Sequence, residues 1–122
     1  MTLTTSHTGH CHCQAITLTI AASPLDLNGC NCTLCTKTGG LWGYFDPADV
    51  AITGQTGGYV RRDLTPFLTT HFCPRCGVVT HWSPLPDARQ NRMGVNMRLF
   101  PPEATHGLET RHHDGRSWGD TE

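Results

Sequence analysis

The chain has 122 residues with 13 glycines, 8 prolines and an apolar fraction of 37%, which fits one domain of short elements and many turns. Its formal net charge is −1 without a basic block, which argues against nucleic acid and anionic membrane surfaces as partners. The apolar runs are far shorter than the ~20 residues of a membrane span, and the first ten residues lack the pattern of a signal peptide. We therefore expect one domain over residues 1–122, located in the cytoplasm, where thiols stay reduced.

Short strands are predicted along most of the chain, and helical periodicity is nearly absent. Ile16, Leu18 and Ile20 alternate with smaller or polar residues, which is the pattern of a half-buried strand. Further strand candidates, bounded by turn signals, lie at residues 41–45, 50–52, 58–62, 66–72, 78–82 and 94–100. Residues 101–104 predict one helical turn because proline stands at their start, and residues 83–92 predict a long polar loop. The sequence thus predicts a mainly β domain.

Seven cysteines fall into three tight clusters. We call them the N-terminal pair (Cys11 and Cys13), the cysteine triplet (Cys30, Cys32 and Cys35) and the C-x-x-C pair (Cys73 and Cys76). An odd number leaves one cysteine over in a disulfide framework, and cysteines two positions apart rarely bridge without strain. Scattered inert thiols would not cluster in this way. The spacing therefore favours metal binding.

The number of cysteines in each cluster indicates how the metals are shared. Zinc in a closed structural site takes four ligands. The C-x-x-C pair supplies two, and Gly77 after it permits the positive φ that turns backbone N–H groups toward sulfur. The cysteine triplet can supply three by itself, which leaves the N-terminal pair to complete the first set. We predict two zinc ions per chain: one closed, and one with an open position for water or a substrate atom.

The residues around these clusters resemble the glutathione-dependent formaldehyde-activating enzyme (GFA) family. The resemblance is carried by GHCHC, CNCTLC, HFCPRCG and the late HHDGRSW, over a core of about residues 9–118, and all seven cysteines fall on the family pattern. It implies a zinc-stapled β-tent of small antiparallel sheets joined at the metal. It also implies a structural zinc on Cys11, Cys13, Cys73 and Cys76, and a functional zinc on Cys30, Cys32 and Cys35. One departure is Gln14, where the family usually has glycine.

The activity that this resemblance implies is that of a carbon–sulfur lyase, in which glutathione and formaldehyde form S-(hydroxymethyl)glutathione or are released from it. The expected partner is therefore a small thiol such as glutathione. Zinc with three thiolates carries a net charge of −1, and a thiol bound to it is deprotonated. Such a thiolate could attack the formaldehyde carbon once the site positions it. Two alternatives stay open: a protein that binds a thiol without catalysis, and a zinc-stabilised structural domain.

The structural alternative requires a fourth protein ligand at the cysteine triplet, and the chain has eight histidines that could supply it. We interpret His71 and His81 as packed histidines, and His112 and His113 as a solvated turn. Lys37 and the arginines could attract glutathione's carboxylates, but we interpret them as solvated side chains: Lys37, Arg61, Arg62 and Arg98. Three aromatic residues could either wall the site or pack in the core: Trp42, Tyr44 and Phe45.

Overall fold

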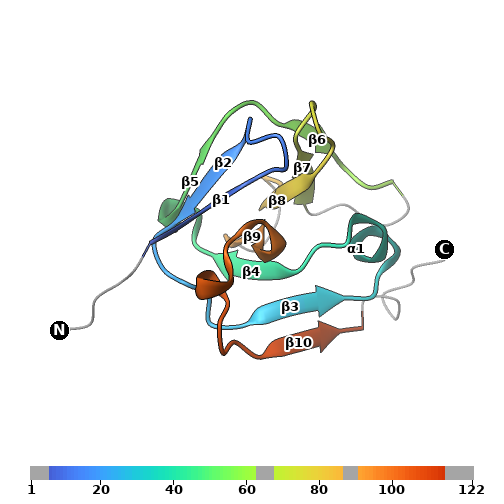
Figure 1. Ribbon diagram of the computed structural model, residues 1–122. Helices are drawn as coiled ribbons and strands as arrows, with labels where there is room; N and C mark the ends of the chain where they lie inside the picture. The colour runs from blue at the N-terminus through green and yellow to red at the C-terminus, as the bar shows by residue number, and fades with distance from the viewer. Residues whose placement is uncertain (1–5, 63–67, 87–90, 115–122) are drawn as a thin grey trace.

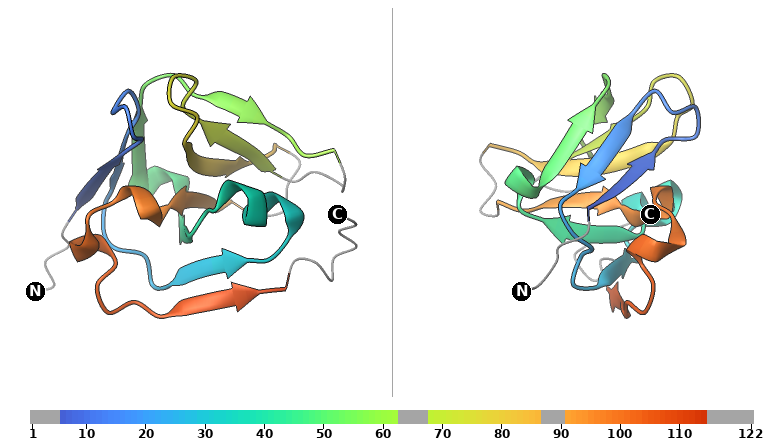
Figure 2. Two further views of the ribbon diagram at one scale, coloured as in Figure 1. Left: turned by 45° about the vertical axis from the view of Figure 1, so that its right-hand side comes forward. Right: turned by 60° about the vertical axis from the view of Figure 1, so that its left-hand side comes forward.

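The computed structural model of the chain describes residues 6–62, 68–86 and 91–114. These residues form two β-sheets with a short α-helix and short 3₁₀ turns, which confirms the prediction of a mainly β fold (Figure 1). One sheet has three strands and the other has seven. The two sheets are inclined to one another, as the views of Figure 2 show.

The three-stranded sheet contains β1 (His7–His10), β2 (Thr17–Ile20) and β5 (Val50–Thr53), in the order β1-β2-β5. Both pairings are antiparallel. Leu18 and Ile20 are fully buried, while Thr17 and Thr19, which alternate with them, are partly exposed, which confirms the alternation read from the sequence. We did not predict β1, because its sequence HTGH carries no apolar residue and hence no period-two signal.

The seven-stranded sheet has the order β10-β3-β4-β9-β8-β7-β6. Its strands are β3 (Leu27–Cys30), β4 (Trp42–Phe45), β6 (Gly57–Tyr59), β7 (Leu68–Phe72), β8 (Val79–Pro84), β9 (Met93–Asn96) and β10 (Thr110–His113). The strands β4 to β9 lie where the sequence predicts strands, although β6 stops before Arg61. Neighbouring strands are antiparallel throughout, except that β10 runs parallel to β3.

The helix α1 (Thr33–Thr38) links β3 to β4, and the 3₁₀ turns are η1 (Pro47–Asp49), η2 (Met97–Leu99) and η3 (Pro102–Ala104). The turn η3 confirms the predicted helical turn at residues 101–104. The predicted strand at 94–100 is wrong in its second half, which forms η2. The cause is the Asn96 side chain, which accepts a hydrogen bond from the Arg98 N–H at 3.2 Å and starts the turn.

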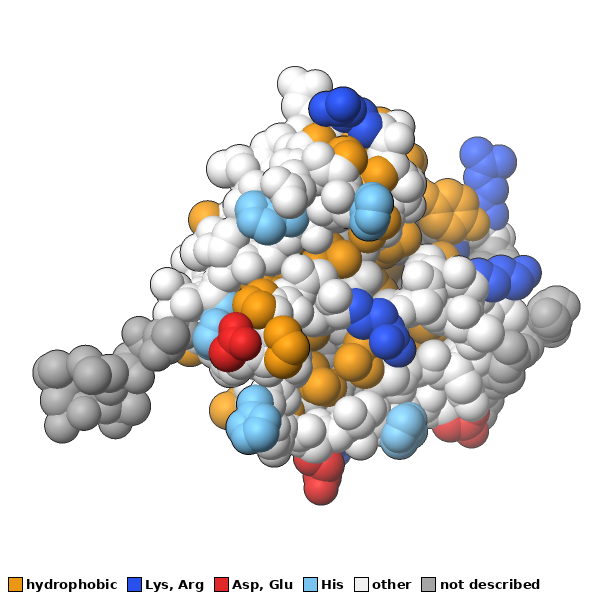
Figure 3. Space-filling view, viewed as in Figure 1, with side chains coloured by type: hydrophobic (Ala, Val, Ile, Leu, Met, Phe, Trp, Pro, Cys, Tyr) orange, Lys and Arg blue, Asp and Glu red, His pale blue; other side chains and the backbone are white. Residues whose placement is uncertain are grey.

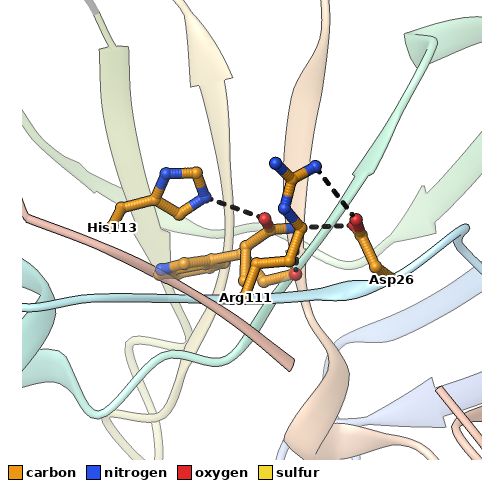
Figure 4. A network of polar contacts seen from close by, with 5 residues as sticks. Asp26, Arg111 and His113 are labelled. Carbon is orange, nitrogen blue, oxygen red and sulfur yellow. Dashed lines mark hydrogen bonds and ion pairs between the residues drawn. The ribbon is translucent and has the colours of Figure 1, made fainter. Parts of the chain in front are cut away.

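The predicted solvated turn at His112 and His113 is also wrong, because both residues lie in β10. A chain of side-chain contacts ties this strand to β3 (Figure 4). Arg111 lies 3.5 Å from the Asp26 carboxylate, and His113 Nε2 lies 2.8 Å from Asn28 Oδ1. The last part of the HHDGRSW motif, residues 115–118, lies outside the described residues.

The buried core joins side chains of both sheets. The three-stranded sheet and the residue before β2 contribute Ile16, Leu18 and Ile20, and the seven-stranded sheet contributes Leu27, Met93 and Val95. Two cysteines, Cys11 and Cys73, belong to the same core. No helix in the described part of the chain is long and apolar enough to cross a membrane. On the face seen in Figure 3, basic and acidic side chains are scattered rather than gathered into one patch.

Candidate metal centres

The N-terminal pair and the C-x-x-C pair come together between the two sheets. The N-terminal pair follows β1, and the C-x-x-C pair lies in the turn between β7 and β8. All four sulfur atoms lie within 4.8 Å of one another. The Sγ–Sγ distances are 3.8 Å for Cys11–Cys13 and 3.6 Å for Cys13–Cys73. Tetrahedral zinc with Zn–S bonds of ~2.3 Å separates its sulfur ligands by ~3.8 Å, so this donor set fits zinc.

Backbone N–H groups donate to sulfurs of this set. The N–H of Ile16 donates to Cys11 Sγ at 3.3 Å, and that of Arg75 donates to Cys73 Sγ at 3.4 Å. Backbone N–H groups, first that of Cys13, lower the pKa of the Cys76 thiol to about 6. Gly77 has φ +80°, which confirms the left-handed position expected after the C-x-x-C pair. The pKa of Cys73 is also lowered, first by the N–H of Cys76. The N–H of Ala15 lowers the pKa of Cys13, but burial and the neighbouring thiols outweigh it and raise this pKa to about 11. The C-x-x-C pair is therefore the half of this set that ionises more readily.

Gln14 occupies a backbone position that favours glycine. Its φ is 68°, and no other non-glycine residue in the described segments has a positive φ. The Gln14 N–H donates to the Cys11 carbonyl at 3.0 Å, which closes a tight turn around the N-terminal pair. Glycine would fit this position without strain, because a left-handed φ strains a residue that carries a Cβ.

The cysteine triplet is built by the end of β3 and the first turn of α1. Cys30 ends the strand, Cys32 is the N-cap residue of the helix, and the Cys35 N–H donates to Cys32 Sγ at 3.3 Å. The three sulfurs lie within 4.8 Å of one another. Among the described residues, no histidine, cysteine, aspartate or glutamate joins this group as a fourth donor. The triplet thus has three candidate ligands for one metal ion.

The pKa values of the three thiols favour their joint ionisation only when a cation is bound. Burial, followed by the negative charges of Cys32 and Cys30, raises the pKa of the Cys35 thiol well above its usual range. Burial also raises the pKa of Cys32, but the Cys35 N–H, the neighbouring thiols and Arg61 outweigh it, so the net pKa of Cys32 is lowered. Three thiolates this close repel one another, so all three ionise together only around a positive ion.

A buried donor beside the triplet agrees with this interpretation. The indole N–H of Trp42 is buried and finds no hydrogen-bond acceptor among the described residues. Trp42 and Cys35 line the same cavity, and although burial raises the pKa of the Cys35 thiol overall, the indole contributes to lowering it. A buried donor without an acceptor costs free energy. A metal-bound thiolate at Cys35, or a ligand beside it, would supply the missing acceptor.

The triplet forms one wall of a cavity of about 140 Å³. Its other lining residues are mostly apolar or aromatic, with two threonines, two arginines and one histidine: Leu34, Thr38, Trp42, Tyr44, Arg61, Leu68, Thr70, Trp82, Arg92 and His113. Tyr44 meets Trp82 edge to face at 5.9 Å between ring centroids. The Arg92 guanidinium stacks over Tyr44 at 4.0 Å from the ring centroid. Such a mainly apolar hollow with few polar groups is typical of a small-ligand site.

The structure sorts the remaining candidate residues. Trp42 and Tyr44 wall the cavity, whereas Phe45 packs against the core. Three of the four cations are exposed, as expected: Lys37, Arg62 and Arg98. The interpretation of Arg61 as a solvated side chain is wrong, because only 5% of it is exposed and it lines the cavity.

Two histidines that we considered as ligands pack against each other instead. His71 and His81 stack with their ring centroids 4.2 Å apart and their planes at 5°, which confirms the interpretation as packed histidines. Neither of them lines the cavity, whereas His113 does. The HHDGRSW motif marks this segment in the sequence, but no local pattern assigns His113 to the cavity, because the residue reaches it through the pairing of β10 with β3.

Comparisons with known proteins agree with this architecture. The sequence model of the family described as glutathione-dependent formaldehyde-activating enzyme matches residues 6–112. No curated protein matches the chain. The crystal structure of a Rhodobacter sphaeroides protein, a structural genomics target, is similar with a TM-score of 0.64. The two sequences are 20% identical, and the structural match covers 85% of this chain and 99% of the other, which shows a shared fold. The chain therefore belongs to the family of glutathione-dependent formaldehyde-activating enzymes.

Proposed function

We propose that the cysteine triplet takes up a small thiol, and that the chain acts as a carbon–sulfur lyase on the adduct of this thiol with formaldehyde. Glutathione is the thiol that the family description names. The observation that carries the proposal is the triplet itself. Three thiols lie together at a cavity wall, and the described residues offer no fourth protein donor to them.

Two zinc ions per chain are part of this proposal. Cys11, Cys13, Cys73 and Cys76 would hold one as a structural ion, and Cys30, Cys32 and Cys35 would hold the other beside the cavity. When bound at the triplet, zinc would supply the Lewis acidity that keeps a substrate thiol ionised at neutral pH. Soft thiolate donors of this kind suit zinc.

The chain's own residues would hold the reactants and exclude water. Trp42, Tyr44 and Trp82 form an aromatic wall beside the triplet, which lowers the local dielectric and strengthens charge interactions. In the reaction, the thiol sulfur attacks the formaldehyde carbon and a carbon–sulfur bond forms. The carbonyl electron pair moves to oxygen, which takes up a proton. The reverse reaction breaks the same bond.

His113 is placed to take part in the proton balance. The Asn28 amide nitrogen donates to Asp26 at 3.0 Å and to the Trp42 carbonyl at 3.3 Å, which fixes the orientation of the amide. Asn28 Oδ1 is then the acceptor of the 2.8 Å contact with His113 Nε2. This leaves Nδ1 of a neutral His113 as an acceptor at a residue that lines the cavity.

The first test measures thiol binding to the zinc-loaded chain kept under reducing conditions. Metal analysis should give two zinc ions per chain, and calorimetry should show glutathione binding with release of a proton. S-methylglutathione, which has no ionisable thiol, should bind much more weakly. Cys32→Ala should lose thiol binding, whereas Thr36→Ala on the exposed side of α1 should keep it. Equal affinities for glutathione and its S-methyl form would contradict thiol binding at the triplet.

The second test separates an enzyme from a protein that only binds. Thiols add to formaldehyde spontaneously, so the exchange between free and adduct formaldehyde should be followed by NMR with and without the chain. We expect exchange faster than the uncatalysed rate, and expect Cys32→Ala to remove the difference. Tight thiol binding without faster exchange would identify a thiol-binding protein instead. If the chain shows no thiol binding and no faster exchange, it is a structural zinc domain.

A further inference from the structure

Arg61 is a buried cation beside the cysteine triplet. It follows β6 in the chain, and only 5% of it is exposed. Its Nη1 lies 3.9 Å from Cys32 Sγ, and its Nη2 donates to Thr33 Oγ1 at 3.3 Å. Arginines are rarely buried to this degree, and this guanidinium is held between a candidate metal ligand and the first residue of α1. These contacts hold the guanidinium beside the sulfur.

The net charge of a metal ion bound at the cysteine triplet explains why a cation beside it matters. A divalent ion with three thiolates carries a net charge of −1, and a fourth thiolate would make it −2. A neutral fourth ligand, such as imidazole or water, would leave the charge unchanged. Inside a cavity with aromatic walls, additional negative charge is costly unless a cation lies close to it. The guanidinium of Arg61 stays protonated at any working pH and can offset this charge.

We propose that Arg61 is a positioning residue that makes the metal at the cysteine triplet prefer an anionic fourth ligand, a thiolate, over a neutral one. The inference rests on the proposed function and adds the residue that selects the ligand. The other cavity arginine is less suited to this role. Arg92 is exposed and stacks on Tyr44, so water screens its charge. Arg62, the next residue after Arg61, is exposed and does not line the cavity.

The experiment compares a charged and a neutral ligand on the same metal. The chain is loaded with cobalt(II), whose absorption reports the ligands, and titrated with 2-mercaptoethanol and separately with imidazole. 2-Mercaptoethanol carries no carboxylate, so a contact between arginine and a substrate carboxylate cannot produce the result. The variants are Arg61→Gln, which removes the charge but keeps hydrogen-bonding groups, and Arg61→Lys, which keeps the charge. Arg62→Gln is the matched control for a lost charge at the exposed neighbour.

Arg61→Gln should weaken 2-mercaptoethanol binding by about 10- to 100-fold, because the added negative charge loses its attraction to a nearby buried cation. Its imidazole affinity should change by less than about threefold, because that ligand adds no charge. Arg61→Lys should recover most of the thiol affinity, and Arg62→Gln should match the wild type. The thiolate-to-cobalt charge-transfer band of the ligand-free chain should also shift in Arg61→Gln, because Cys32 Sγ has lost its charged neighbour.

Several results would overturn the inference. If Arg61→Gln weakens the binding of 2-mercaptoethanol and imidazole equally, the residue has a structural role. If neither affinity changes, the residue has no role in ligand choice. If Arg61→Gln does not fold, Arg61→Met replaces it, and failure of both would show that the residue serves the fold. A wild-type chain that binds no thiol would refute the proposed function itself, a result distinct from thiol binding that ignores Arg61.

Discussion

Replacing Cys73 with serine should destabilise the chain more than replacing Cys35 with serine. The four-cysteine centre joins positions 60 residues apart, Cys13 and Cys73, whereas the cysteine triplet spans only residues 30–35. Closing a loop of this larger size removes about 4 kcal/mol of unfolded-state entropy, compared with about 2 kcal/mol for the short one. Cys73 is also fully buried in the core, so a serine hydroxyl there adds a desolvation cost.

The assay is urea unfolding of the zinc-loaded variants in reducing buffer, with metal content measured before each run. Total stability of domains is about 5–15 kcal/mol, so Cys73→Ser should lose much of it and Cys35→Ser about half as much or less. A strong chelator should bring the wild type to the level of Cys73→Ser or below. It should change Cys73→Ser itself much less. Equal losses for the two serine variants would refute the view that the four-cysteine centre carries the long-range connection.

Three further predictions concern individual positions. Gln14→Gly should stabilise the chain by about 0.5–1 kcal/mol, because relief of left-handed strain exceeds the added entropy of glycine; a melting temperature that falls would contradict this. Gly94→Ala should cost about 1–3 kcal/mol and weaken thiol binding, since the new Cβ would meet the Trp82 indole that walls the cavity; unchanged thiol affinity would show that Trp82 is not required. Burial, with a smaller contribution from His71, lowers the pKa of His81 to about 3 from its usual 6.5, so the unfolded chain binds more protons between these values. Stability should therefore be complete above pH 6.5 and fall by about 1.4 kcal/mol per pH unit below it. Urea unfolding at pH 5.5 should show this loss in the wild type and not in His81→Gln, beyond any acid loss of metal common to both; identical slopes would contradict it.

The cysteine clusters and most strands could be read from the sequence because both are local signals. A triplet within six positions can meet only if the chain turns, and the alternation of Ile16, Leu18 and Ile20 needs only neighbours to be recognised. The left-handed turn at Gly77 is equally local, because the glycine follows directly on the C-x-x-C pair. The grouping of four and three cysteines followed from counting ligands, and the family pattern pointed the same way.

The surroundings of the triplet were decided by tertiary structure alone. Arg61 lies 29 positions from Cys32, and His113 lies 85 positions from Asn28, yet both pairs are in contact. Each residue carries an ordinary polar side chain whose burial depends on the distant segments that pack over it, and the local sequence pattern does not predict that burial. The parallel pairing of β10 with β3 is likewise a long-range event between two short strands, TRHH and LNGC, whose sequences lack apolar alternation. Residue type and spacing thus predict the cysteine ligands, whereas the charged and aromatic residues around the triplet are brought there only when distant segments pack together.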